Sequence, residues 1–351
     1  MPELNNKRSP CPVERQNEAT VRDTVCALTS LYEANRRCKR EIGYKNSVSR
    51  FNSLILSKGY KLGIECANRE YETGKGGKME VTYPKHRVVQ TTFYRDRLPQ
   101  TSFILNFFYP EIVPKLSQNS HACVKGRGVD AARNQFKEML RNASPDAYCL
   151  KTDISNYFGS IDHFTLIREM FFYIHDAWAK WFYANVIMAN EGFVGIGLGS
   201  EIHQLSAVVF LNHLDQIVSF YNDNYERYMD DFVFVGTKHE CEIVASFIES
   251  YLKRLKLKIS KKKTFIQPIT KPVKFLGFSF LRHSTGKVTM KRLKCRLNDE
   301  RRRLKKMKQN NIPLDRVKEH YNSVRALMRH GNRSDLMQLD RYVRSLWPEI
   351  K

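Results

Sequence analysis

The sequence lacks the paired cysteines that mark a structural zinc site. Its eight cysteines are scattered, and no two have C-x-x-C spacing, so a zinc finger or ribbon is not indicated. No apolar run is long enough to span a bilayer, and the first residues contain no apolar segment typical of a signal peptide. We therefore expect a cytoplasmic protein with reduced thiols and no membrane partner.

Acidic residues are scarce relative to basic ones. The 36 Asp and Glu face 59 Lys and Arg, which gives a formal net charge of +23. So basic a chain attracts polyanions, because each phosphate that it neutralises releases counterions. Composition alone leaves open a nucleic-acid-binding protein and an ordinary basic enzyme. The 351 residues, 42% of them hydrophobic, can bury a large core, which excludes disorder throughout the chain.

Hydrophobic spacing predicts the main helices and strands. The stretch 286–310 has eleven basic and two acidic residues and an apolar stripe at helical period, which predicts one basic amphipathic helix. Apolar residues at three- and four-residue spacing predict helices elsewhere, and runs rich in Val, Thr and aromatic residues predict strands. The expected helices are 21–40 and 202–215, and the expected strands lie within 79–92, 147–153, 227–236 and 273–281.

Three aspartates follow apolar strands. Asp230 and Asp231 stand where the strand segment 227–236 is expected to turn back. Alone, such a pair is usually a solvated turn. Asp153, however, ends a second apolar strand, and pairing of the two strands would bring it beside Asp230. Burying like charges is unfavourable without a cation, and hard oxygen ligands suit magnesium. Three carboxylates can hold two metal ions about 4 Å apart.

The same residues resemble the motifs of reverse transcriptases. Tyr228-Met229-Asp230-Asp231 is similar to the family signature, and Leu150–Phe158 is similar to the motif that precedes it. Phe275-Leu276-Gly277-Phe278 resembles the primer-grip hairpin. The resemblance covers about 83–281 and implies an α+β right-hand polymerase fold, with an antiparallel palm sheet, fingers and a small helical thumb. The implied order is an N-terminal tail and helical extension at 1–44, fingers at 45–145, palm at 146–281 with a fingers segment at about 160–195, and a basic thumb at 282–351.

The resemblance also implies roles for individual residues. Asp153, Asp230 and Asp231 would be catalytic and, with Ile154, would hold two magnesium ions, for which manganese could substitute. Phe158 would be a steric gate that selects deoxynucleotides. Other implied contacts fall into three sets. Lys85, Arg87, Gly199, Gln204 and Lys263 would bind the nucleotide, Phe275, Leu276 and Gly277 would grip the primer, and Lys125, Arg127, Lys291, Arg292, Arg302 and Lys305 would bind nucleic acid.

One loop departs from the broad family pattern. Leu198 precedes Gly199 where the family usually carries Pro-Gln-Gly, and His203-Gln204 replaces Ser-Pro. The Gln204 ending is similar to diversity-generating retroelement enzymes and to bacterial enzymes of phage defence. Because Leu198 stands where the family pattern has glutamine, we expect looser checking of the nascent base pair, and low fidelity is a hypothesis. Lys261–Lys263 equally fits a solvated charge run.

Three functions are consistent with the charge of the sequence. The first is an RNA-directed DNA polymerase that makes cDNA by two-metal-ion nucleotidyl transfer, in a bacterial or phage defence system or a diversity-generating retroelement. The others are a non-catalytic RNA-binding scaffold and an RNA-directed RNA polymerase, against which the intact aspartates, Tyr228-Met229 and Phe158 argue. The expected partners are an RNA template, such as a dedicated non-coding RNA, a DNA or RNA primer and deoxynucleoside triphosphates. An accessory protein or a homo-oligomer is left open.

Overall fold

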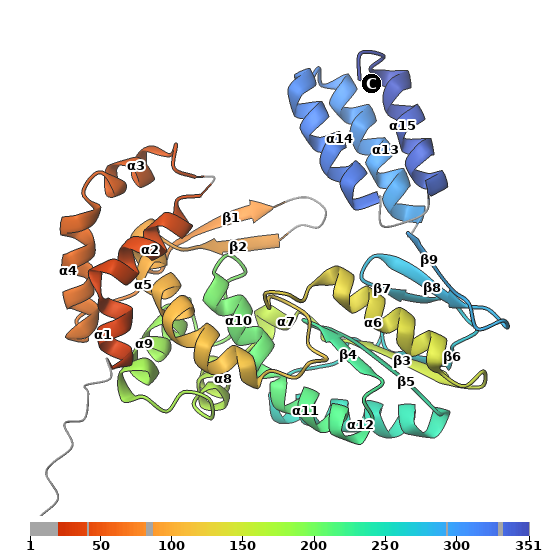
Figure 1. Ribbon diagram of the computed structural model, residues 1–351, viewed down its shortest axis with the longest axis horizontal. Helices are drawn as coiled ribbons and strands as arrows, with labels where there is room; N and C mark the ends of the chain where they lie inside the picture. The colour runs from red at the N-terminus through yellow and green to blue at the C-terminus, as the bar shows by residue number, and fades with distance from the viewer. Residues whose placement is uncertain (1–19, 41, 82–86, 293, 329–332, 351) are drawn as a thin grey trace, which may run out of the picture. The chain divides into compact units, whose positions relative to one another are not determined.

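The computed structural model describes every residue except 1–19, 41, 82–86, 293, 329–332 and 351 (Figure 1). The described chain forms two compact units, and each is built from more than one stretch of sequence. The first unit takes its residues from 1–114, 167–191 and 199–202, and the second from 115–166, 192–198 and 203–351.

The first unit is mainly helical. The expected helix at 21–40 is broken at Ala27, whose ψ of 138° is extended, so it forms two helices. In the aromatic core of this unit Trp178 stacks on Phe182, with ring centroids 5.3 Å apart, and the Phe103 ring lies tilted against the same Phe182 at 5.0 Å. The elements are α1 (Val21–Cys26), α2 (Leu28–Cys38), α3 (Asn46–Asn52), α4 (Ile55–Ala67), the hairpin β1 (Gly77–Val81) and β2 (Arg87–Thr91), α5 (Tyr94–Phe103), the π-helix Ile104–Ile112, the 3-10 turn Val113–Lys115 and α9 (Ala177–Met188). The helix α8 (His163–Met170) begins in the second unit and ends in the first.

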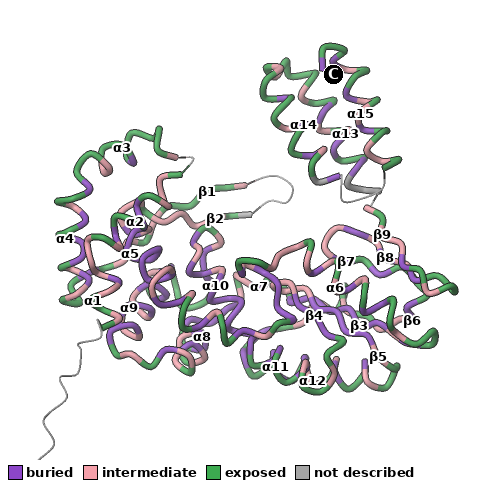
Figure 2. The backbone as a smooth tube through the Cα atoms, viewed as in Figure 1, coloured by how far each residue is buried: buried purple, intermediate pink, exposed green. Residues whose placement is uncertain are grey.

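An antiparallel sheet of four strands forms the centre of the second unit. Its order is β4 (Tyr225–Tyr228), β5 (Asp231–Gly236), β3 (Tyr148–Asp153) and β6 (Phe265–Pro268). Figure 2 shows β3, β4 and β5 as largely buried, whereas β6 at the edge of the sheet is half-buried with an exposed first residue. Helix α6 (Val129–Asn142) packs on the face that carries Val233 and Val235, and α12 (Lys238–Arg254) packs on β3 and β5. Together they give the sheet a buried core.

The expected helix at 202–215 is also two helices. They are α10 (Glu201–Phe210) and α11 (Asn212–Tyr221), separated at Leu211. A single-turn helix, α7 (Tyr157–Ser160), follows the end of β3. Residues 115–145, assigned above to the fingers, lie in the second unit. The reason is that Phe136 and Met139 of α6 pack into the core of the palm sheet.

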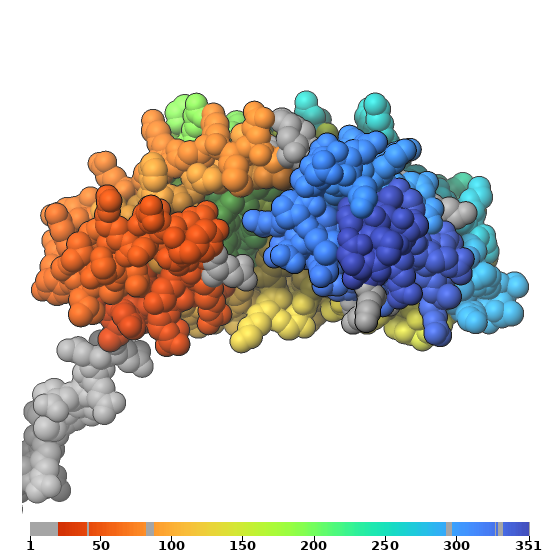
Figure 3. Space-filling model, turned by 90° about the horizontal axis from the view of Figure 1, so that it is seen from above, coloured from red at the N-terminus to blue at the C-terminus, as the bar shows by residue number. Residues whose placement is uncertain are grey.

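The basic C-terminal helix is shorter than expected. Residues 288–292 form β9 (Val288–Arg292), which pairs with β8 (Phe278–Arg282), while β8 pairs with β7 (Val273–Phe275). Gly286, with φ +79°, turns the chain back toward β8, so Lys291 and Arg292 lie in a strand. The chain then forms a bundle of three helices around a separate apolar core: α13 (Lys294–Gln309), α14 (Leu314–Met328) and α15 (Arg333–Leu346). The outer surface of this bundle is coloured blue in Figure 3. None of the helices described has the length and hydropathy needed to cross a membrane.

Candidate active site

The three aspartates come together at one end of the palm sheet. Asp153 ends β3 and lies directly opposite Asp231, the first residue of β5. Asp230 occupies the turn between β4 and β5, and its carbonyl accepts a hydrogen bond of 3.0 Å from the amide of Ile154. Met229 completes this turn with φ +60°. The strand pairing predicted from the sequence is therefore present, and it places three carboxylates on neighbouring backbone positions.

Two lysines neutralise part of this charge. Lys263 Nζ lies 2.7 Å from both carboxylate oxygens of Asp153, and Lys151 forms an ion pair with Asp231. Lys151 is buried, and burial lowers the pKa of its ammonium group to about 8. Burial, and next the charge of Asp153, raise the pKa of Asp230 above its ordinary value. A further cation at the carboxylates would relieve this repulsion.

Lys151 was not predicted to be part of the site, although the two-residue periodicity of strands indicates that it lies near the carboxylates. Side chains two residues apart share a face of a strand, so Lys151 lies on the same face as Asp153. The Lys151 ammonium also lies 5.7 Å from the centre of the Phe275 ring. It thus links the expected primer grip to the carboxylates.

A buried arginine supports the aspartate turn. Arg227 is fully buried, and its guanidinium pairs with Asp215 of α11 at 2.5 Å. The same guanidinium donates hydrogen bonds to the carbonyls of Met229 at 2.8 Å and Val208 at 2.9 Å. Arg227 therefore fixes the turn that carries Asp230. Sequence reasoning missed it, because its partner Asp215 lies twelve residues away on a different element.

The donor set at the carboxylates suits a hard divalent cation. Asp153, Asp230 and Asp231 offer carboxylate oxygens, the ligand type that magnesium prefers, and Ile154, whose amide is bonded to the Asp230 carbonyl, follows Asp153 directly. Within the described residues, no three Asp, Glu, His or Cys side chains are arranged as ready metal ligands. Asp153 and Asp231 are paired with lysines instead. The chemistry of the residues fits magnesium, and Lys263 and Lys151 would compete with the ion.

Phe158 lies five residues after Asp153, on α7. Its ring is half-buried and meets the Tyr157 ring edge-on, with centroids 5.7 Å apart. The carbonyl of Phe158 accepts a hydrogen bond of 2.9 Å from the amide of Ile196. Tyr157 is anchored through its hydroxyl to the carbonyl of Ala207 at 2.6 Å. The backbone of Phe158 and the Tyr157 ring beside it are therefore both anchored.

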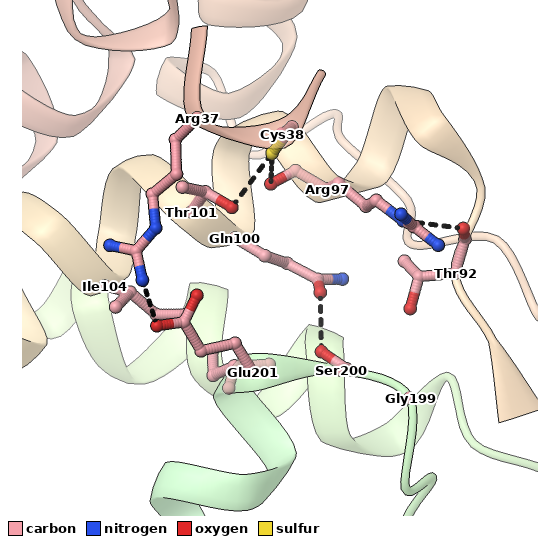
Figure 4. Close-up of a pocket in the computed structure, with 11 residues that line it drawn as sticks. Arg37, Cys38, Thr92, Arg97, Gln100, Thr101, Ile104, Gly199, Ser200 and Glu201 are labelled. Atoms are coloured by element: carbon pink, nitrogen blue, oxygen red, sulfur yellow. Dashed lines mark hydrogen bonds and ion pairs between the residues drawn. The ribbon is translucent and has the colours of Figure 1, made fainter. Parts of the chain in front are cut away.

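Gly199 lines a pocket of the first unit (Figure 4). The cavity measures about 210 Å³ and is bordered by α2, α5 and the start of α10. A Cβ at Gly199 would lie 2.4 Å from the carbonyl oxygen of Gln90, so only glycine permits this approach to β2. Ser200 donates to the Gln100 side chain at 3.2 Å, and Arg37 pairs with Glu201 at 2.5 Å. These contacts hold the loop against the first unit.

Gln204 belongs to the second unit, unlike Gly199. Its amide nitrogen donates to the carbonyl of Leu198 at 3.0 Å, and its amide oxygen lies 3.7 Å from the Cys123 sulfur. His203 is buried, and burial lowers the pKa of its imidazole to about 4. His203 and Gln204, which stand where the family pattern has Ser-Pro, thus bind back to the loop that precedes them, at Gly197 and Leu198.

The expected primer-grip residues form the tight turn between β7 and β8. Leu276 and Gly277 have φ of 45° and 83°, and Phe275 is buried. The Arg133 guanidinium donates to the Leu276 carbonyl at 2.8 Å and lies 4.2 Å from the centre of the Phe278 ring. Arg133, which the sequence analysis did not single out, therefore braces this turn from α6.

The remaining predicted residues are placed as follows. Lys85 lies outside the described residues, and Arg87 begins β2. Lys125 is exposed, whereas Arg127 donates to the carbonyls of Ser117 and Ser120 at 2.6 and 2.8 Å. This bonding gives Arg127 a structural role in its loop. Lys291, Arg302 and Lys305 are exposed, and Arg292 is half-buried.

Comparison with known proteins adds a family match and two structural similarities. The model of the family described as "Reverse transcriptase (RNA-dependent DNA polymerase)" matches residues 85–280, more than half of the chain. The fold is similar to apo telomerase from Candida tropicalis, with 12% identity, a TM-score of 0.42 and coverage of 60% of this chain and 47% of that one. It is also similar to telomerase from Candida albicans in complex with a TWJ fragment of telomeric RNA, with 11% identity, a TM-score of 0.45 and coverage of 80% and 61%. No curated protein matches the sequence.

Proposed function

The chain belongs to the reverse transcriptase family and has its right-hand polymerase fold, and from this premise we propose that it synthesises cDNA on an RNA template. The observation that carries the proposal is the convergence of Asp153, Asp230 and Asp231 at the end of β3 and β5. The chain spans about half to two-thirds of the telomerase chains to which it is similar. We therefore propose the activity, substrates and partners of the whole protein together with this site.

In the proposed site, Asp153, the Ile154 carbonyl, Asp230 and Asp231 hold two magnesium ions, for which manganese can substitute. When bound, the ions would activate the primer 3′-hydroxyl and stabilise charge on the triphosphate. Lys263, whose ammonium lies 2.7 Å from Asp153, would donate a proton to the leaving pyrophosphate. Phe158 would close the space that a 2′-hydroxyl needs. Arg227 would keep the Asp230 turn in place through its bond to the Met229 carbonyl.

Other contacts of the proposal lie around this site. The turn of Leu276 and Gly277 would hold the primer. Lys125 and the exposed cations of the thumb would contact the nucleic-acid backbone, which favours shape over sequence. The nucleotide would also meet the segments that carry Lys85, Arg87, Gly199 and Gln204. For Arg127 we propose only an indirect part, since its guanidinium donates to loop carbonyls.

The test is DNA synthesis on a primed RNA with magnesium and deoxynucleotides. We expect Asp230→Asn to lower synthesis by at least about a thousandfold while RNA affinity stays at the wild-type level. Wild-type protein that binds RNA but makes no product would favour the scaffold function. Incorporation of ribonucleotides in preference to deoxynucleotides would favour RNA synthesis instead.

For the biological role, we propose a cytoplasmic enzyme of a phage-defence system or a diversity-generating retroelement. The support is the loop from Gly195 to Gln204, which is similar to enzymes of those two groups. Such an enzyme would copy a dedicated non-coding RNA and would work with an accessory protein or a second copy of the chain. Sequencing the RNA that copurifies with the protein, and the cDNA made from it, tests this role. Copurification of random cellular RNA would contradict it.

A further inference from the structure

Two phenylalanines of the second unit are stacked on each other in the open. Phe164, in the first turn of α8, is 59% exposed, and Phe193, in the loop after residue 191, is 61% exposed. Their ring centroids are 5.7 Å apart with an interplanar angle of 29°. The neighbouring Val194 is 55% exposed. Large apolar side chains that cluster at the surface usually mark a site of interaction.

The phenylalanine pair, Phe164 and Phe193, is held in place by its backbone. The amide of His163 donates to the carbonyl of Phe193 at 2.9 Å, and Val194 pairs with Asp162 as an isolated β-bridge. The Gly195 amide donates to the Ile161 carbonyl at 2.8 Å. The loop is thus fastened to the start of α8 at Phe193 and at the two residues after it, so the stacked rings are a fixed feature of the surface.

A run of basic residues extends from the carboxylates to this pair. The segment 251–264 contains seven Lys and Arg and no acid, and all seven are exposed. It pairs with the end of β3: the Ser155 amide donates to the Lys258 carbonyl at 2.8 Å, and the Ser260 amide donates to the Asp153 carbonyl at 2.7 Å. Farther from the carboxylates along this segment, Lys256 Nζ lies 3.0 Å from Asp162 Oδ2. Asp162 is the residue that forms the β-bridge with Val194. We call Lys253, Lys256, Lys258, Lys261 and Lys262 the lysine row.

We propose that the phenylalanine pair and the lysine row form a binding surface for single-stranded RNA, separate from the three carboxylates. Exposed aromatic rings stack with bases of any sequence, and a flanking row of cations follows the phosphates. A duplex keeps its bases stacked internally and cannot use the rings. The segment 251–264 carries seven cations and no acid, and this excess of positive charge favours a polyanion over an apolar protein segment. This surface goes beyond the proposed polymerase activity and does not depend on it.

The test measures RNA binding by the full chain. The probe is a fluorescein-labelled oligouridine of about 20 nucleotides, and unlabelled primer–template duplex is added to occupy the carboxylate site. We expect the double variant F164A/F193A to bind about tenfold more weakly, because stacking of at least one base is lost. Phe220→Ala is the matched control, since Phe220 is 95% exposed on α11 of the same unit, and we expect it to bind like wild type.

The lysine row is tested in the same assay. K256Q/K258Q is expected to weaken binding and to reduce its salt dependence, whereas Lys238→Gln on α12 should leave both unchanged. Irradiation of a bromouridine-containing probe should cross-link the peptide that contains Phe193. Wild-type affinity in F164A/F193A, with cross-links elsewhere, would overturn the proposal and leave the pair to an apolar protein partner.

A second readout separates this inference from the proposed function. On a primer–template with a single unpaired template nucleotide, which leaves no single-stranded segment for the proposed surface, F164A/F193A should make DNA at the wild-type rate. Absence of synthesis by the wild-type protein would contradict the polymerase proposal and leave the RNA-binding result unaffected. Loss of synthesis on this short template in F164A/F193A alone would overturn the inference, because it would place the pair within the catalytic machinery.

Discussion

Glu226 and Arg227 are successive residues of β4, and both ionisable side chains are buried, on opposite faces of the palm sheet. Arg227 is paired with Asp215 and bonded to two carbonyls. Glu226 is equally buried, yet neither of its carboxyl oxygens has a hydrogen-bond partner among the described residues. Burial raises the pKa of Glu226 to about 9. A carboxyl group is therefore kept neutral under one face of the sheet, while a full ion pair supports the other.

The raised pKa makes stability depend on pH. Between the ordinary value of 4.5 and about 9, folded Glu226 is protonated and the unfolded group is ionised, so folding binds a proton and stability falls as pH rises. We expect wild type to lose stability relative to Glu226→Gln by about 1.4 kcal/mol per pH unit at most. Urea unfolding of both proteins from about pH 6 to about pH 9 measures this difference. A constant difference across that range would mean that Glu226 is ionised in the folded protein.

Removal of Arg227 should damage both stability and activity. Arg227→Met leaves the Asp215 carboxylate buried without a cation, which should cost about 3–5 kcal/mol in urea unfolding. The double variant R227M/D215L removes both charges and should recover most of that loss. DNA synthesis should stay low in both variants, because the Met229 carbonyl at the aspartate turn has lost its donor. Full activity in the double variant would show that the turn does not need Arg227.

Among the elements, the first turn of α10 is held most closely by its neighbours in the first unit. The loop before it approaches β2 at Gly199, and Glu201 is paired with Arg37 at the end of α2. Both side chains of the pair are 36% exposed, so the pair contributes at most about 1 kcal/mol to global stability. Its effect is local: it ties helix α2 to the loop of Gly199 that is proposed to meet the nucleotide.

Charge reversal tests this link. Arg37→Glu and Glu201→Arg each place like charges together, and each should raise KM for deoxynucleotides several-fold, while the melting temperature changes little. The double variant R37E/E201R restores an ion pair and should return KM toward the wild-type value. Steady-state kinetics on a primed RNA give the values. Equal KM in all four proteins would mean that the loop keeps its position without the pair.

At the scale of the whole molecule, the net charge of +23 governs association with nucleic acid. The bundle of α13, α14 and α15 has its own apolar core and presents exposed Arg302 and Lys305 on α13. RNA affinity should therefore fall by about a thousandfold or more between 50 and 200 mM salt. R302Q/K305Q should reduce the slope of log Kd against log salt by one to two. Lys318→Gln on the exposed side of α14 is the control, and an equal slope in both variants would place the RNA contacts off α13.

The sequence by itself determined the strands that carry the aspartates and the family of the chain. The strand-forming run 232–235 and the turn at Asp230 predict the β4–β5 hairpin and its pairing with the strand of Asp153, and the observed register puts Asp153 opposite Asp231. These signals are local, so they are readable without a structure. The helix predicted over 286–310 was too long, because residues 288–292 pair with β8 as a strand and this pairing outweighs their helical periodicity. The helix breaks at Ala27 and Leu211 were not predicted.

Only the tertiary structure decided which charges meet. The pairs of Lys263 with Asp153, Lys151 with Asp231 and Arg227 with Asp215 each join different elements. Strand periodicity places Lys151 on the face of Asp153, but it does not show which carboxylate each cation meets, because that is set by the packing of elements far apart in the chain. For the same reason, the unpartnered burial of Glu226 and the exposure of the phenylalanine pair became visible only once the chain was folded.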